Sequence, residues 1–281
     1  MAAKYAHFLA IFAPTMNREF LLNILFLVFI NLLVKPFFIF GIDLGVQNRV
    51  GPEVYGGYFA LLSFTFIFQM LNDFGIQNFN NTIIARHPQL LPKYFPNLLI
   101  IKGLFSLGYL VLTLILAVAW GFRQPAQLEL LGWLAVNQVL VALIFFLRSN
   151  VSGLGFFRID SLLSALDKLV AIGLMSWLLW ARPFAWPLEI REFAIAQTAS
   201  LLLTAAACFW VLRGHLTGLN WRFRRPLLFL LIKKSAPFAL VILLMTACTR
   251  LDVVLLERLL PDGPEQAGIY GNGYRMLDAA N

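Results

Sequence analysis

Long runs of apolar residues, separated by short polar connectors, follow one another along the chain. Several of these runs are close to the roughly 20 residues that a helix needs to cross about 30 Å of hydrocarbon. The predicted spans are Phe20–Gly41, Tyr55–Asp73, Leu98–Gly121, Leu130–Arg148, Leu162–Trp180, Phe193–Leu212 and Pro237–Leu255, and an eighth begins near Gln266. The runs lack the alternation of barrel strands, so the pattern predicts an all-α, polytopic transmembrane helical bundle.

The composition excludes an ordinary soluble protein. Hydrophobic residues make up 60% of the chain and charged residues only 13%, whereas about a quarter of a soluble chain is charged. The two cysteines, Cys208 and Cys248, lie in apolar runs, and the sequence has no CxxC motif and no Cys/His cluster. A disulfide framework is therefore excluded. We expect no metal site and no cofactor.

The basic residues indicate how the spans are oriented. The N-terminal segment and every second connector carry most of the Lys and Arg, while the other connectors are richer in Glu and Asp. This bias predicts a cytoplasmic N-terminus in the inner (plasma) membrane. The net charge of +8 is then explained by the orientation of the spans and by contact with anionic membrane lipids. We expect no nucleic-acid partner. The most basic connector, Gly214 to Ser235, is either an interfacial helix or a solvated loop.

Ionisable and amide side chains inside the first span predict a cavity wall. Such groups are costly in a bilayer and usually face a bundle interior or water. Asn31, Lys35 and Asp43 fall within an arc of roughly 120° on a helix, and Lys35 precedes the helix-bending Pro36. The alternative is that Lys35 extends to the membrane surface and that Asp43 is interfacial.

A second polar group lies at the end of the second span. On a continuous helix its members occupy an arc of roughly 140°; they are Gln69, Asn72, Asp73, Gln77 and Asn80. We predict that this arc lines a polar cavity and that Asp73 has a charged partner. The alternative is that these groups only form hydrogen bonds between helices.

Three further charged residues lie in or near the later spans. Arg250 falls near the middle of the seventh span, and Asp252 follows at about 200° around the helix. We therefore expect the two side chains to point in opposite directions, one to a cavity and one to a neighbouring helix. Alternatively, Arg250 only ties helices together. Lys102 enters the third span near its cytoplasmic end, from where a lysine side chain can reach the surface.

Motifs of catalysis do not occur in the sequence. It has no Walker A loop, no Gly-x-Ser-x-Gly, no HExxH and no Asp-x-Asp motif. The glycines between Gly41 and Gly57 lie at a span boundary, where turns and close helix contacts explain them better than a phosphate loop does. We therefore expect a protein that is not an enzyme.

Four segments resemble polysaccharide-export flippases, which are bacterial members of the multidrug/oligosaccharidyl-lipid/polysaccharide (MOP) exporter superfamily. The first two are LVKPFFIFGID at Leu33–Asp43 and VQNRVGPEVYGGYF at Val46–Phe59. The others are FTFIFQMLNDFGIQNF at Phe64–Phe79 and YGNGYRMLDAA at Tyr270–Ala280. The Gly-Pro-Glu-x-Tyr-Gly-x-Tyr pattern and the later Asp-Phe-Gly carry most of the resemblance.

The resemblance implies two lobes related by a pseudo-twofold axis, similar to those of multidrug (MATE) exporters. Residues 1–213 would form the six-helix first lobe, 214–235 the basic cytoplasmic connector, and 236–281 the start of the second lobe. The chain stops within the eighth span, so it is expected to be a fragment of a longer family member.

The resemblance also implies a function. A lipid-diphosphate-linked sugar or oligosaccharide would be flipped from the cytoplasmic to the outer leaflet for polysaccharide or lipopolysaccharide synthesis, in contact with membrane lipids and with other polysaccharide-assembly proteins. The diphosphate would bind to Lys35, Arg49, Lys102 and Arg250. Asp43, Asp73 and Asp252 are candidates for coupling or charge balance. Alternatives are a multidrug or cation exporter of the same superfamily, and a membrane-bound polymerase or acyltransferase of polysaccharide assembly.

Overall fold

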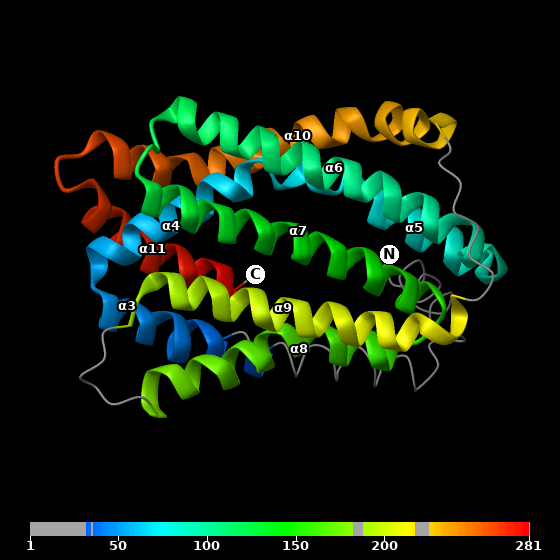
Figure 1. Ribbon diagram of the computed structural model, residues 1–281, viewed down its shortest axis with the longest axis horizontal. Helices are drawn as coiled ribbons and strands as arrows, with labels where there is room; N and C mark the ends of the chain where they lie inside the picture. Colours follow the sequence, from blue (N-terminus) through cyan, green and yellow to red (C-terminus); the bar gives the residue numbers. More distant parts are fainter. Residues whose placement is uncertain (1–31, 35, 182–187, 217–224, 281) are drawn as a thin grey trace, which may run out of the picture.

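The computed structural model describes residues 32–34, 36–181, 188–216 and 225–280, and nearly all of them lie in helices (Figure 1). The α-helices are α3 (Leu44–Val50), α4 (Pro52–Ile67), α5 (Ile76–Arg86), α6 (Leu91–Trp120), α7 (Pro125–Gly153), α8 (Phe157–Ser176), α9 (Ile190–Leu212), α10 (Arg225–Leu259) and α11 (Gly263–Ala280). Shorter π- or 3₁₀-helical segments are η1 (Phe38–Asp43), η2 (Gln69–Asn72), η3 (Pro88–Leu90), η4 (Trp177–Ala181) and η5 (Arg213–His215). No strand occurs in these described ranges.

The long helices confirm an all-α, polytopic membrane bundle. Within the described part of the chain, five segments are long and apolar enough to cross a membrane. They are Pro88–Trp120, Pro125–Gly153, Phe157–Trp180, Ile190–His215 and Ala239–Leu259, and they correspond to the third to seventh predicted spans. Apolar side chains such as Leu107 and Ile115 on α6 and Met245 on α10 are exposed, as expected of helix faces in contact with lipid.

Successive spans run in opposite directions, and α4 and α5, the two parts of the second span, share one direction. In Figure 1 the α3–α4, α6–α7 and α10–α11 connections lie at the left end, whereas α5–α6 and α7–α8 lie at the right end. The orientation was predicted from Lys and Arg in every second connector, which requires that successive connectors lie on opposite sides, as they do here. The cytoplasmic placement of the right-hand end remains a prediction.

The first predicted span continues beyond its expected end at Gly41. The π-helical η1 leads into α3, which ends at Val50 where Gly51 adopts a φ of 88°; Pro52 then starts α4. Only glycine adopts such a φ readily, and proline suits a first helical position. The helix thus extends past the predicted end of the apolar run, and it includes Asp43 and Gln47, which are only 2% and 5% exposed.

The basic connector, for which a helix and a loop were both considered, is helical in its second half. Helix α10 begins at Arg225, inside the predicted connector Gly214–Ser235, so its second half is the first part of α10. Residues 217–224 lie outside the described ranges. The eighth predicted span is α11, which begins at Gly263 rather than near Gln266.

Helices α4 and α11 are in close contact because glycines face each other. A Cβ atom on Gly56 would overlap the carbonyl group of Pro264, and one on Gly268 would overlap that of Pro52. Gly271 packs against the ring of Phe59 in the same way. Small residues permit such close approach between membrane helices. The prediction that glycines near Gly51–Gly57 serve turns and helix contacts is thereby confirmed for Gly51 and Gly56.

Candidate functional site

The second predicted span is broken. Helix α4 ends at Ile67, η2 follows, and Phe74 and Gly75 then adopt φ angles of 44° and 74° before α5 begins. A right-handed helix cannot continue through these left-handed positions. The prediction of one polar arc along a continuous helix is therefore wrong for residues 69–80. Instead, the break determines where each polar side chain lies.

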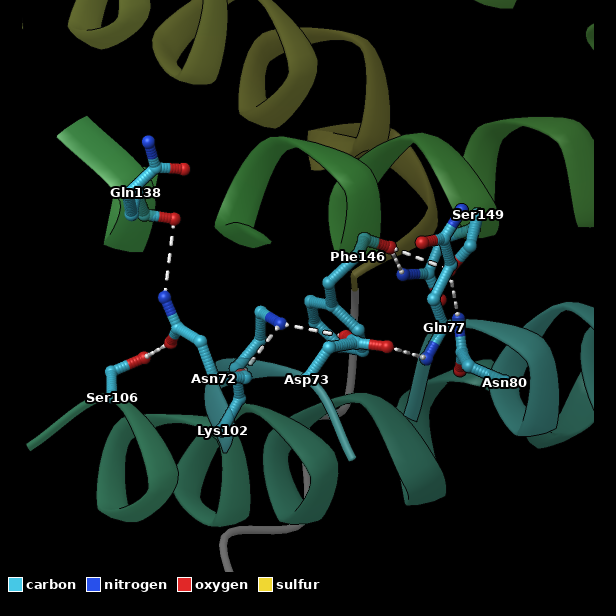
Figure 2. A network of polar contacts seen from close by, with 10 residues as sticks. Asn72, Asp73, Gln77, Asn80, Lys102, Ser106, Gln138, Phe146 and Ser149 are labelled. Atoms are coloured by element: carbon cyan, nitrogen blue, oxygen red, sulfur yellow. Dashed lines mark hydrogen bonds and ion pairs between the residues drawn. The ribbon is translucent and has the colours of Figure 1, made fainter. Parts of the chain in front are cut away.

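Lys102 on α6 is directed at this break (Figure 2). Its Nζ lies 2.9 Å from Asp73 Oδ1 and donates a second, longer hydrogen bond of 3.4 Å to the carbonyl oxygen of Asn72. Lys102 is 2% exposed and Asp73 24%. Lys102 therefore does not extend to the surface, and Asp73 compensates for the loss of its hydration. The predicted charged partner of Asp73 is therefore Lys102.

Asn72 joins the same break to two helices (Figure 2). Its Oδ1 accepts a hydrogen bond of 2.6 Å from Ser106 on α6, and its Nδ2 donates one of 3.1 Å to the carbonyl oxygen of Gln138 on α7. The side chain is fully buried. A buried amide needs such partners, so the structure gives Asn72 an interhelical role.

Asn80 has a similar role within α5. Its Nδ2 donates a hydrogen bond of 2.9 Å to Ser149 Oγ on α7, and Ser149 in turn donates to the carbonyl oxygen of Phe146 at 2.7 Å. Gln77 contributes its backbone N–H, 3.4 Å from Asp73 Oδ2. Asn72 and Asn80 thus form hydrogen bonds between helices, which was the alternative to lining a cavity. Cavity lining by them and by the partly exposed Gln69 and Gln77 remains a prediction.

A second charged pair joins η1 to α11. Arg275 Nε lies 2.8 Å from Asp43 Oδ2, although the two atoms lack the alignment of a hydrogen bond. Asp43 is 2% exposed and Arg275 18%. The carboxylate of Asp43 is therefore enclosed by other helices, and its depth in the membrane remains a prediction.

Polar side chains of α3, α4 and α9 surround this pair. Tyr55 and Tyr58, each 1% exposed, interact with both charges. Tyr58 also makes a long hydrogen bond to the side chain of Gln197 on α9. Gln47 donates a hydrogen bond of 3.2 Å to the carbonyl oxygen of Gly268 on α11. The first helix and α11 are thus linked by charged and uncharged contacts.

Arg250 on α10 lies between two aromatic rings. Its Cζ is 4.9 Å from the ring centroid of Phe66 on α4 and 4.3 Å from that of Tyr274 on α11. Asp252 accepts a short hydrogen bond from the hydroxyl of Tyr270, also on α11. Asp252 therefore meets a neighbouring helix, as predicted for one of the two. Arg250 also contacts α11. This was not expected, because residues two positions apart on a helix point in nearly opposite directions.

Arg49 at the end of α3 has a different environment. Its guanidinium donates a short hydrogen bond to the carbonyl oxygen of Leu179 in η4, which follows α8. This contact ties the first helix to the fifth predicted span and fits an anchoring role. Diphosphate binding by Arg49 remains a prediction.

The predicted site residues thus fall into separate groups. Asp73 and Lys102 meet at the helix break, Asp43 lies against α11, and Arg250 and Asp252 contact that same helix. Asn31 and Lys35 lie outside the described residues. Of the four predicted diphosphate ligands, the three that the structure describes, Arg49, Lys102 and Arg250, therefore lie in different environments.

Sequence reasoning missed Arg275 and the two buried tyrosines. Arg275 stands in the motif Tyr270–Ala280, but that segment was interpreted as an interrupted span, and its charge was not considered as a partner for Asp43. A charged residue within a predicted span was the available signal. Tyr55 and Tyr58 had no such signal, because tyrosines near a span boundary usually mark the membrane surface.

A family model described as "Polysaccharide biosynthesis protein" matches residues 20–281. The matched range includes all the contacts described above. Neither the curated proteins nor the solved structures contain a match to the chain.

Proposed function

The chain belongs to the polysaccharide biosynthesis protein family, and on this premise we propose that it flips a lipid-diphosphate-linked sugar or oligosaccharide from the cytoplasmic to the outer leaflet. The family consists of MOP-superfamily polysaccharide flippases, whose members are generally transporters rather than enzymes. The proposal extends this membership to a substrate class and a direction of movement.

One observation carries the proposal: charged side chains gather where α10 and α11 meet the first two helices. Arg250 lies near the middle of the span Ala239–Leu259, and Arg275 and Asp43 form an ion pair between α11 and η1. A charge in the bilayer is costly and marks a substrate or ion pathway more often than lipid contact. Arginine is well suited to phosphate, because its planar N–H donors match phosphate oxygens in pairs.

The arrangement supports a mechanism in which these helices change partners. The diphosphate enters between the predicted lobes from the cytoplasmic side and binds Arg250. The close glycine contacts of α4 and α11 then hold the outer ends together until the lobes rock. Outward opening separates α11 from η1 and α4, so the Asp43–Arg275 pair breaks at that step. The lipid tail remains in the bilayer throughout.

The break at Asp73 and Lys102 has a supporting role in this proposal. Broken helices are common in transporters, where they lie at the interface between parts that rock against each other. Here α5 is bound to α7 through Asn80 and Ser149, whereas α4 is packed against α10 and α11. The ion pair of Lys102 with Asp73 holds the junction to α6 while the two halves tilt.

The cellular setting is also proposed. The bias of basic residues supports an inner-membrane protein with a cytoplasmic N-terminus, in contact with membrane lipids and with other polysaccharide-assembly proteins. Lys35 and Arg49 would contact the diphosphate in other stages of the cycle. Asp43, Asp73 and Asp252 would balance charge or couple transport to an ion gradient. The protein acts without catalysis of bond cleavage.

Removal of Arg250 tests the assignment in cells whose glycan export depends on this protein. We expect Arg250→Ala to abolish export while the protein inserts in the membrane at its normal level. The matched control is Arg86→Ala, which removes an exposed arginine at the end of α5 and should leave export unchanged. Normal export by the Arg250→Ala protein would contradict the assignment.

A further inference from the structure

The environment of Arg250 contains aromatic rings from both predicted lobes. Phe66 belongs to α4, in the first lobe, while Tyr274 and Arg250 belong to α11 and α10, in the second. The ring centroids lie 4.9 and 4.3 Å from Arg250 Cζ. These distances are within the roughly 6 Å over which a ring face attracts a cation. The guanidinium is therefore held by two faces that approach from different helices.

Tyr274 is itself fixed by other rings. Its centroid lies 6.3 Å from that of Phe59 on α4 and 6.3 Å from that of Tyr270 one turn earlier on α11. Tyr270 is in turn bound through its hydroxyl to Asp252 on α10. The Tyr274 ring thus occupies a defined position with respect to both α10 and α4.

We propose that Phe66 and Tyr274 are positioning residues that hold the Arg250 guanidinium ready for the diphosphate of the lipid-linked substrate. This inference rests on the proposed function and adds two residues to it. Ring stacking engages the faces of a guanidinium, whereas its N–H donors project in its plane, where a phosphate is bound. A side chain already held in place loses less conformational entropy when the anion binds.

The two rings have different roles in the transport cycle. Tyr274 and Arg250 lie on adjacent helices of the second predicted lobe, so they move together. Phe66 lies on the first lobe and leaves Arg250 when the lobes separate at that level. In the state with separated lobes, the guanidinium has lost the Phe66 ring, and of the two rings only Tyr274 still contacts it. This weaker hold favours release of the diphosphate in that state.

Binding of farnesyl diphosphate to the purified full chain in detergent tests the inference, with uncharged farnesol as the reference ligand. We expect the wild-type chain to bind the diphosphate more tightly than the alcohol. Tyr274→Leu should weaken binding of the diphosphate about tenfold, the order of effect of a lost desolvated cation–π contact. Tyr274→Phe keeps the ring and should bind almost as the wild type does. Phe209→Leu, which removes a ring that pairs with Phe95, is the matched control and should have no effect.

A double-mutant cycle separates positioning from general packing. If Tyr274 acts through Arg250, Tyr274→Leu should cause little further loss in an Arg250→Ala background. Equal weakening in both backgrounds, or unaltered binding by the Tyr274→Leu chain, would overturn the positioning role while leaving the proposed function intact. A wild-type chain that binds farnesol as well as farnesyl diphosphate would instead overturn the proposed function and the positioning role with it.

Discussion

Lys102 and Asp73 form an ion pair of 2.9 Å that joins α6 to the break in the second helix. The lysine is 2% exposed, so its charge depends on this carboxylate and on the carbonyl oxygen of Asn72. The sequence placed both residues inside or beside spans but did not bring them together. The pair explains how a charged and kinked segment is accommodated inside an apolar bundle.

Loss of one member of this pair should destabilise the fold. Lys102→Met leaves the Asp73 carboxylate without its counter-charge. Breaking a fully buried pair costs about 3–5 kcal/mol, and because Asp73 is 24% exposed the loss here should lie at or below the lower end of that range. Thermal unfolding of the purified protein in detergent should therefore show a clearly lower midpoint. The double variant Lys102→Met/Asp73→Asn should recover much of the loss, because neither charge then remains.

An exposed ion pair provides the control for that measurement. Arg191 and Glu129 also lie 2.9 Å apart, but their side chains are 52% and 47% exposed. Exposed pairs contribute at most about 1 kcal/mol, so Arg191→Met should hardly move the midpoint. Equal midpoints for Lys102→Met and the wild type would contradict a structural role of the buried pair.

Adjacent glycines on α4 should differ sharply in their tolerance of a side chain. Gly56 faces the carbonyl group of Pro264, whereas a Cβ on Gly57 would have no atom within 4 Å. Gly56→Ala forces α4 and α11 apart, and overpacking of this kind costs about 1–3 kcal/mol. Gly57→Ala should be neutral or slightly stabilising. The same thermal unfolding assay distinguishes them, and a neutral Gly56→Ala would refute the close contact.

Asp43 and Arg275 should be energetically coupled. Asp43→Asn and Arg275→Gln each leave one buried charge, while the double variant leaves none, so the sum of the single effects should exceed the double effect. We expect a coupling of about 0.5–3 kcal/mol in a double-mutant cycle. Asp43→Asn combined with Lys102→Met changes residues of two different pairs and should be additive. Additivity of Asp43→Asn with Arg275→Gln would show that the two residues are not partners.

Hydropathy predicted the third to seventh spans, because each of these apolar runs forms one long helix. It failed where polar residues are buried. The apolar run of the first span stops at Gly41, whereas the helix continues through the buried Asp43 and Gln47 to Val50. Helical periodicity failed at Phe74 and Gly75, because a local change to positive φ removes the constant rotation per residue on which an arc depends.

The candidate site was only partly predicted, for a related reason. A charge within an apolar span could be recognised as significant at Asp43, Asp73 and Arg250 without knowledge of the fold. Its partner could not, because Lys102 and Arg275 reach their partners through tertiary contacts between different helices. The aromatic contacts of Arg250 likewise depend on how α4, α10 and α11 pack.

Movement of the lipid between leaflets tests the central claim most directly. The full chain is reconstituted in liposomes that contain a fluorescent polyprenyl-diphosphate sugar, and a membrane-impermeant reductant then bleaches the label exposed outside. Protein-free liposomes, and those with Arg250→Ala protein, should retain the protected inner-leaflet label. With wild-type protein we expect nearly all the label to be bleached, because inner-leaflet lipid reaches the outside. Protection equal to that of protein-free liposomes would contradict the claim that this chain is a flippase.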